Sequence, residues 1–129
     1  MIGDDQEPGI VVLAVRQIFK EIEASEDREF LLRVGYFEIY NEKIYDLLEQ
    51  NSIELKLHDT KHGETNIAGL REIIASSESD ILMHFEAGNK MKRVGETAMN
   101  DRSSRSHGIF RIVSFYSFDL YHVLTLNPL

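Results

Sequence analysis

The sequence predicts an α/β fold in which helices flank a central sheet, and two observations support this class. Segments with apolar residues at helical spacing alternate along the chain with segments rich in aromatic and β-branched residues. Short polar or glycine-containing stretches separate these segments. Because the expected strands and helices are interspersed, a layered α/β architecture is favoured over a helical bundle or a β-sandwich.

The first third of the chain contains the clearest helix and the clearest strand. Pro8-Gly9 marks a turn, and apolar residues at helical spacing then predict an amphipathic helix that ends at about Ala24. Residues 30–40, FLLRVGYFEIY, are nearly continuous in apolar character, which predicts a strand buried on both faces. After this strand we expect Asn41 to cap a short helix that turns three apolar side chains inward. These are Ile44, Leu47 and Leu48.

The middle of the chain predicts short strands. Ile53, Leu55 and Leu57 alternate with polar residues, which indicates a half-buried strand. His62-Gly63-Glu64 has the composition of a hairpin loop, and residues 67–75 predict one further strand or a pair of short ones.

A second helix and a last strand complete the pattern. Ser77-x-x-Asp80 is a variant of the capping box and predicts a helix start, and Gly88-Asn89 predicts its end. Residues 108–117 then predict a final strand.

Composition excludes several classes of function. The 129-residue chain has 14 basic and 22 acidic residues, so its net charge of −8 argues against a nucleic-acid or anionic-membrane binder. There is no cysteine, which excludes disulfides, thiolate zinc sites and a cysteine nucleophile. No uninterrupted apolar stretch approaches the ~20 residues of a membrane span, and we expect no secretory signal at the start.

One segment is rich in side chains that can bind phosphate or metal ions. Residues 100–107, NDRSSRSH, combine three hydroxyls, two guanidiniums, an amide and an imidazole directly before the last expected strand. Such a loop can bind Mg²⁺ or phosphate through serine, orient a terminal phosphate through asparagine, and stabilise charge through arginine. The alternative is a basic surface loop that is a target for phosphorylation. The sequence holds no G-x-x-x-x-G-K-[ST], G-x-G-x-x-G or H-E-x-x-H motif.

Two long motifs together resemble a known family. Residues 36–48, YFEIYNEKIYDLL, are similar to the strand-and-helix signature of the kinesin motor domain, and residues 100–107 are similar to its switch I motif, N-x-x-S-S-R-S-H. The resemblance implies a partial P-loop NTPase fold with a mixed central sheet and flanking helices. Residues 1–113 would be the central part of the motor domain, and residues 114–129 a divergent apolar tail of unknown structure.

The resemblance implies roles for the serine-arginine segment in a complete motor that binds ATP and Mg²⁺. Asn100 would lie near the terminal phosphate. Ser103 and Ser104 would contact the phosphate, the metal or its waters, with Ser104 the metal contact. Arg105 would pair with an acidic residue of switch II.

Further residues would act at the edges of that site or on the partner. Ser106 and His107 would complete the nucleotide-binding set by anchoring the loop to the next strand. The region from Lys61 to Arg71 would be a weak microtubule contact.

The family pattern also implies that parts of the motor are missing. Its phosphate-binding loop would precede Met1 and its switch II would follow the last matched strand, so we expect this chain neither to bind nor to hydrolyse ATP by itself. The alternative is a non-enzymatic truncated isoform or interaction module that binds tubulin or a motor partner. The resemblance places the protein in the cytoplasm on the microtubule cytoskeleton. Residues 27–34 and 95–100 resemble the centromere-associated CENP-E-like branch, which adds the spindle or kinetochore.

Overall fold

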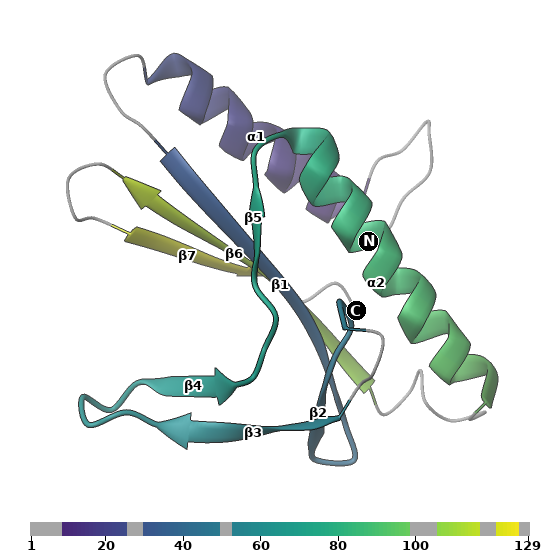
Figure 1. The fold of residues 1–129 in the computed structure, drawn as a ribbon. Coiled ribbons are helices and arrows are strands. Elements are labelled where there is room, and N and C mark those ends of the chain that lie inside the picture. The colour runs from purple at the N-terminus through teal and green to yellow at the C-terminus, as the bar shows by residue number, and fades with distance from the viewer. Residues whose placement is uncertain (1–8, 26–29, 50–52, 99–105, 117–120, 127–129) are drawn as a thin grey trace.

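The computed structural model describes residues 9–25, 30–49, 53–98, 106–116 and 121–126. The elements in chain order are α1 (Ile10–Ala24), β1 (Phe30–Tyr40), β2 (Lys43–Asp46), β3 (Glu54–Asp59), β4 (Thr65–Ala68), β5 (Ile73–Ala75), α2 (Glu78–Ala98), β6 (Ser106–Tyr116) and β7 (Tyr121–Leu126). Both helices lie on the same side of a curled sheet (Figure 1). This arrangement confirms the α/β class.

Strand β1 lies at the centre of the sheet. The strand order is β4-β3-β2-β1-β6-β7, and β5 also pairs with β1. The β1–β6 pairing is the longest, running from Phe30 opposite Tyr116 to Tyr40 opposite Ser106. All pairings between the described strands are antiparallel, so this part contributes no parallel pair to the mixed sheet that the sequence predicts.

The core forms between one face of β1 and the two helices. Alternate β1 side chains, Leu32, Val34 and Tyr36, point to this face because successive residues of a strand face opposite ways. They meet buried side chains of α1, α2 and β6, which are Val11, Val15, Ile81, Phe85, Phe110 and Ile112. The opposite face of β1 is also covered between residues 34 and 38, which confirms the strand buried on both faces.

The prediction of a short helix after Asn41 is wrong, because the chain forms a hairpin there. Asn41 and Glu42 have φ angles of 49° and 63°, and they link β1 directly to β2. Two successive left-handed residues are the geometry of a two-residue turn whose twist matches that of the paired strands. Ile44 and Leu47 are buried as expected, but Ile44 lies in the strand β2.

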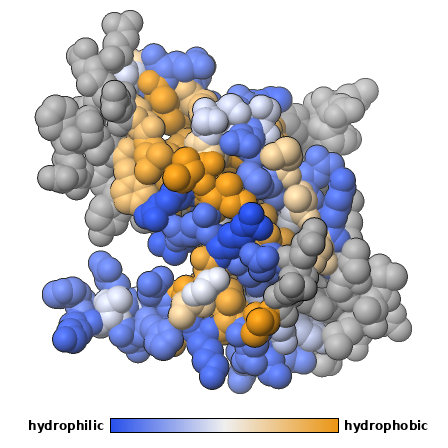
Figure 2. Space-filling view, in the orientation of Figure 1, coloured by the Kyte–Doolittle hydropathy of each residue, from blue (hydrophilic) through white to orange (hydrophobic). Residues whose placement is uncertain are grey.

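The β3–β4 hairpin projects from the body of the protein (Figure 1). Its loop is closed by a hydrogen bond from the Thr60 N–H to the Glu64 carbonyl, 2.8 Å, and Gly63 has a φ of 78°. This confirms the hairpin loop, and residues 67–75 contribute to two short strands. The strand expected around Ile53, Leu55 and Leu57 is confirmed as β3, but its predicted half-burial is wrong, because Ile53 is 76% exposed and Leu57 57% exposed. No helix packs on this arm within the described residues, and its surface is largely hydrophilic (Figure 2).

Helix α2 begins as expected but extends beyond Gly88. The Ser77 hydroxyl accepts a hydrogen bond from the Asp80 N–H, 3.2 Å, and the Asp80 carboxylate accepts one from the Ser76 N–H, 3.3 Å. The predicted end at Gly88-Asn89 is wrong, since the helix continues to Ala98. A glycine is needed at position 88 for close packing, because a Cβ there would lie 2.8 Å from the Tyr36 Cε2 atom.

The last strand lies in the segment expected to be a divergent tail. Strand β7 pairs with β6 from Tyr121 opposite Phe115 to Leu126 opposite Phe110, and it forms an edge of the described sheet. That residues 114–129 diverge from the family pattern stays a prediction. Of the two described helices, neither has the length and apolar character needed to cross a membrane.

Candidate functional site

A polar cluster lies between strand β1, helix α2 and the start of strand β6. Tyr36 and Glu38 of β1 supply its centre, and both face the helices because they lie two positions apart. The β1–β6 register brings Gly108 opposite Glu38 and Ser106 opposite Tyr40. The cluster therefore joins segments that are far apart in the sequence.

The Glu38–Ser106 contact fixes the first residue of β6. The Ser106 hydroxyl donates a hydrogen bond to Glu38 Oε2 at 3.0 Å. The two residues are only 3% and 1% exposed, so water does not compete for this bond. The sequence predicts that Ser106 anchors the loop to the following strand, and this geometry supplies a partner for such an anchor.

The Tyr36–Asn89 contact fixes helix α2 against the same strand. The Tyr36 hydroxyl donates to the Asn89 Oδ1 atom at 2.6 Å, and both residues are buried. The Tyr36 ring stacks on Phe85 at 5.5 Å between centroids and meets Phe110 edge-on at 5.3 Å. Burial raises the pKa of Tyr36 from 10.0 to about 12, so the phenol remains a hydrogen-bond donor at neutral pH.

This raised pKa makes the stability of the protein sensitive to alkaline pH. The folded state keeps the Tyr36 proton between pH 10 and pH 12 while the unfolded state loses it, so stability falls as pH rises through that window. By pH 11 we expect Tyr36 to lower the free energy of unfolding by about 1.4 kcal/mol relative to pH 9.

Urea unfolding at pH 9, 10 and 11 measures this effect, and Tyr36→Phe is the control because it removes the titrating group. The parent chain should lose about 1.4 kcal/mol more than the variant over this range. Equal losses in the two proteins would show that Tyr36 does not keep its proton on folding.

Glycine at position 108 leaves room for a cation beside the cluster. A Cβ at Gly108 would lie 2.9 Å from the Lys92 Nζ atom and 3.6 Å from the Tyr36 hydroxyl. The ammonium group of α2 therefore lies over the β6 backbone, beside Tyr36. Gly108 pairs in register with Glu38, so a basic side chain of α2 lies over the β6 residue opposite this buried acidic side chain.

The structure locates only some of the predicted nucleotide-site residues. Asn100, Ser103, Ser104 and Arg105 lie outside the described residues, so their roles stay predictions. Ser106 and His107 open strand β6 and face opposite ways, Ser106 buried against Glu38 and His107 exposed. Among the described residues, no group of three or more acidic or histidine side chains could hold a metal ion.

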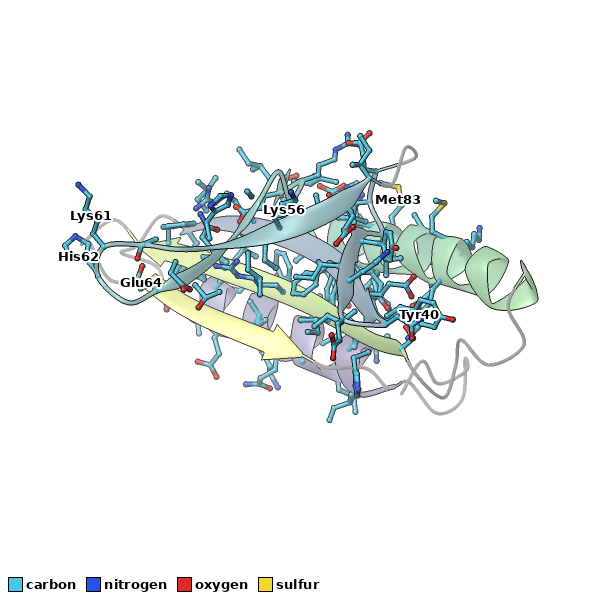
Figure 3. The ribbon with its side chains drawn as sticks, turned by 90° about the horizontal axis from the view of Figure 1, so that it is seen from below. Tyr40, Lys56, Lys61, His62, Glu64 and Met83 are labelled. Carbon is cyan, nitrogen blue, oxygen red and sulfur yellow. The ribbon has the colours of Figure 1, made fainter. Side chains whose placement is uncertain are left out.

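The two predicted partner-binding residues occupy different settings. Lys61 lies at the tip of the projecting hairpin beside His62, where both side chains extend away from the body (Figure 3). Arg71 lies between β4 and β5, where its half-exposed side chain contacts neighbouring residues. Its guanidinium donates to the Leu48 carbonyl at 3.1 Å and is 3.8 Å from a Glu49 carboxylate oxygen. The structure does not place the two cations in one patch.

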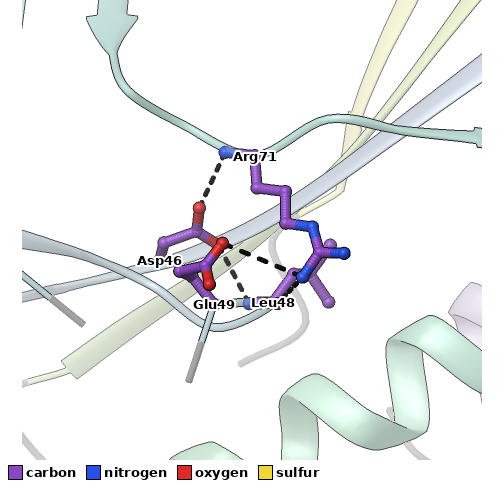
Figure 4. A network of polar contacts seen from close by, with 4 residues as sticks. All are labelled: Asp46, Leu48, Glu49 and Arg71. Carbon is purple, nitrogen blue, oxygen red and sulfur yellow. Dashed lines mark hydrogen bonds and ion pairs between the residues drawn. The ribbon is translucent and has the colours of Figure 1, made fainter. Parts of the chain in front are cut away.

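A buried carboxyl group organises the surroundings of Arg71 (Figure 4). Asp46 is 3% exposed and accepts hydrogen bonds from two backbone N–H groups, that of Leu48 at 2.9 Å and that of Arg71 at 2.7 Å. Burial raises the pKa of Asp46, and the two backbone hydrogen bonds oppose that rise. The hydrogen bond from the Arg71 N–H connects the end of β2 to the chain between β4 and β5.

Sequence reasoning missed three members of the polar cluster, Glu38, Asn89 and Lys92. The signal for Glu38 was present, because it is the only acidic residue in the otherwise apolar segment 30–40. The sequence predicts a helix end at Asn89, and it assigns Lys92 no role. Neither could be placed without knowing that α2 continues to Ala98.

Comparisons with known proteins agree with the sequence motifs. The kinesin motor domain family matches residues 1–116. The Kinesin-like protein KIN-7L of Oryza sativa subsp. japonica is 47% identical over 113 residues, which cover 88% of this chain and 18% of the relative. Kinesin-related protein 11 of Dictyostelium discoideum is 44% identical over 108 residues, covering 82% of this chain and 16% of the relative.

A solved structure shares the whole described fold. A fast kinesin matches with a TM-score of 0.87 at 35% identity, covering 100% of this chain and 38% of the fast kinesin. The chain thus spans less than a fifth of the length of these two curated relatives.

Proposed function

Because this chain belongs to the kinesin motor domain family, we propose that it supplies the nucleotide-sensing switch I segment of an ATP-driven microtubule motor. The observation that carries the proposal is the placement of the motif at residues 100–107. It lies between α2 and β6, and the polar cluster of Tyr36, Glu38, Asn89 and Ser106 ties both of these elements to β1.

In the complete site, the chemistry would be divided between this chain and the rest of the motor domain. ATP bound with Mg²⁺ would supply the phosphoryl group to be transferred to water. Asn100, Ser103 and Ser104 would orient the terminal phosphate and the waters of the metal, and Arg105 would pair with an acid of switch II. The solved fast kinesin was studied for its ATPase mechanism and its interactions with microtubules, which supports this division.

The microtubule contact we propose is the projecting β3–β4 hairpin. Its tip carries Lys61 and His62 on an exposed turn with Glu64 close by, and the Lys61 ammonium group can pair with an acidic protein surface. Arg71 would contribute less, because its guanidinium already contacts Leu48 and Glu49. The cellular location would then be the microtubule cytoskeleton. The centromere-associated branch, with its spindle or kinetochore location, stays a prediction from residues 27–34 and 95–100.

A hybrid motor tests the proposal. Residues 1–116 would replace the matched segment of the rice relative, and we expect the hybrid to hydrolyse ATP with stimulation by microtubules. Arg105→Ala should lower the rate at least ~100-fold, because positioned charges at a phosphoryl-transfer site typically contribute that much. Lys20→Ala, on the exposed side of α1, should leave the rate unchanged.

A folded hybrid without ATPase activity would overturn the proposal and favour the alternative, a non-enzymatic isoform or interaction module that binds tubulin or a motor partner.

The chain by itself should not bind ATP. The sequence lacks the G-x-x-x-x-G-K-[ST] cradle, whose charge-assisted contacts contribute about 1.5–3 kcal/mol each. Since ~1.4 kcal/mol corresponds to tenfold in affinity, losing several contacts removes useful binding. Calorimetric titration with Mg-ATP should therefore give no micromolar dissociation constant. A micromolar value for the isolated chain would contradict the expected division of the site.

A further inference from the structure

Strand β1 holds the two elements that flank the switch I segment, and we infer that Tyr36 and Glu38 are positioning residues for it. This inference rests on the proposed function. Tyr36 fixes α2, which precedes residues 99–105, and Glu38 fixes the start of β6, which follows them. One strand therefore holds both flanking elements, β6 at its first residue and α2 at Asn89, within the helix that ends at Ala98.

The Glu38 contact acts at the first residue of β6. The Ser106 hydroxyl donates to Glu38 Oε2 at 3.0 Å, and the two residues are 3% and 1% exposed. Ser106 pairs in register with Tyr40, so this bond ties the end of the ladder to a side chain two residues further inside β1. The first residues of a strand otherwise separate readily, because no further pair lies beyond them.

The Tyr36 contact acts on the helix. The 2.6 Å bond to Asn89 and the close approach of the ring to Gly88 fix both the rotation and the height of α2 above the sheet. Apolar side chains could bury the same area without these polar contacts. A hydroxyl and a carboxyl group on the core face of β1 instead select one position for each neighbouring element, because a displaced partner leaves a buried polar group without its bond.

Hydrogen exchange of the isolated chain, without nucleotide, tests the Glu38 part of the inference. Ser106→Ala removes the donor, and Glu38→Met removes the acceptor at similar size. Ser106→Ala should speed exchange of the amides at residues 106–108 about tenfold while residues 109–113 change less than about threefold, as expected for the loss of one buried hydrogen bond, and Glu38→Met should speed exchange at residues 106–108 at least as much. Glu38→Gln keeps an acceptor oxygen and should behave as the parent.

Ser114→Ala is the matched control, because it makes the same chemical change on the same strand, where Ser114 pairs with Leu32. It should leave residues 106–108 unchanged. A uniform rise over β6 in Ser106→Ala, or a rise at residues 106–108 in Ser114→Ala, would assign Glu38 a general stabilising role and overturn the inference. So would Glu38→Gln behaving as Glu38→Met.

Tyr36→Phe tests the helix part. It should speed exchange in residues 86–92 of α2 by about tenfold and leave residues 106–108 unchanged, because the two contacts act on different elements. Unchanged exchange in α2 would overturn this part. These measurements need neither ATP nor microtubules, so an inactive hybrid motor would overturn the proposed function and leave this inference to be decided by exchange alone.

Discussion

Replacing Gly88 with alanine should lower the free energy of unfolding by about 2–3 kcal/mol, although alanine is the better helix former by about 1 kcal/mol. The added methyl group would lie 2.8 Å from the Tyr36 Cε2 atom. The ring cannot retreat, because Phe85 and Phe110 contact it at centroid distances of 5.5 and 5.3 Å and its hydroxyl is bonded to Asn89.

Urea unfolding monitored by circular dichroism measures this change. Lys90→Ala is the matched control, since Lys90 is an exposed residue two positions further along α2. Its effect should stay within about 0.5 kcal/mol. A Gly88→Ala protein as stable as the parent would show that α2 and β1 are not in this close contact.

The Asp46→Asn variant should lose about 1–3 kcal/mol of stability at neutral pH. Each carboxylate oxygen of Asp46 accepts a different backbone N–H, those of Leu48 and Arg71. An asparagine has only one oxygen, so its NH₂ group would face one of these donors inside a site that is 3% exposed. The free energy of unfolding, measured in urea at pH 7, tests this.

Glu49→Gln provides the comparison within the same network. Its carboxylate is 3.8 Å from the Arg71 guanidinium, and both side chains are about half exposed, 50% and 53%. Such a pair contributes little in water, so we expect a change below about 0.5 kcal/mol. If Asp46→Asn and Glu49→Gln were equally stable, the hydrogen bonds of Asp46 to the backbone N–H groups of Leu48 and Arg71 would not stabilise the fold.

For helix α2, local sequence signals predicted the start but not the end. The caps at Ser77 and Asp80 are determined by neighbouring residues and were predictable. Gly88 was not, because a glycine that ends a helix and a glycine that admits a ring look the same in sequence. The decisive neighbour, Tyr36, lies far away along the chain.

The prediction of a helix after β1, where the structure has a hairpin, was wrong for a related reason. Ile44, Leu47 and Leu48 have helical spacing, and Asn41 is a good helix cap. The same asparagine tolerates a left-handed backbone, and the Asn41-Glu42 turn takes that form because β2 gains a ladder with β1. Tertiary pairing thus decided between two locally acceptable structures.

In the candidate site too, local motifs were predictable and tertiary contacts were not. The serine-arginine motif was visible from the sequence, whereas the residues that hold its flanking elements were not. Glu38 and Asn89 acquire a role only when β1, β6 and α2 come together.

The pairing of β1 with β6 bears on how the protein emerges from the ribosome. Phe30 pairs with Tyr116, so the central ladder closes only after residue 116 has been made. Until then the edge of β1 that pairs with β6 is open, and the nascent polypeptide is exposed to premature association with other chains. Synthesis of this protein should therefore depend on chaperones that shield unpaired strand edges.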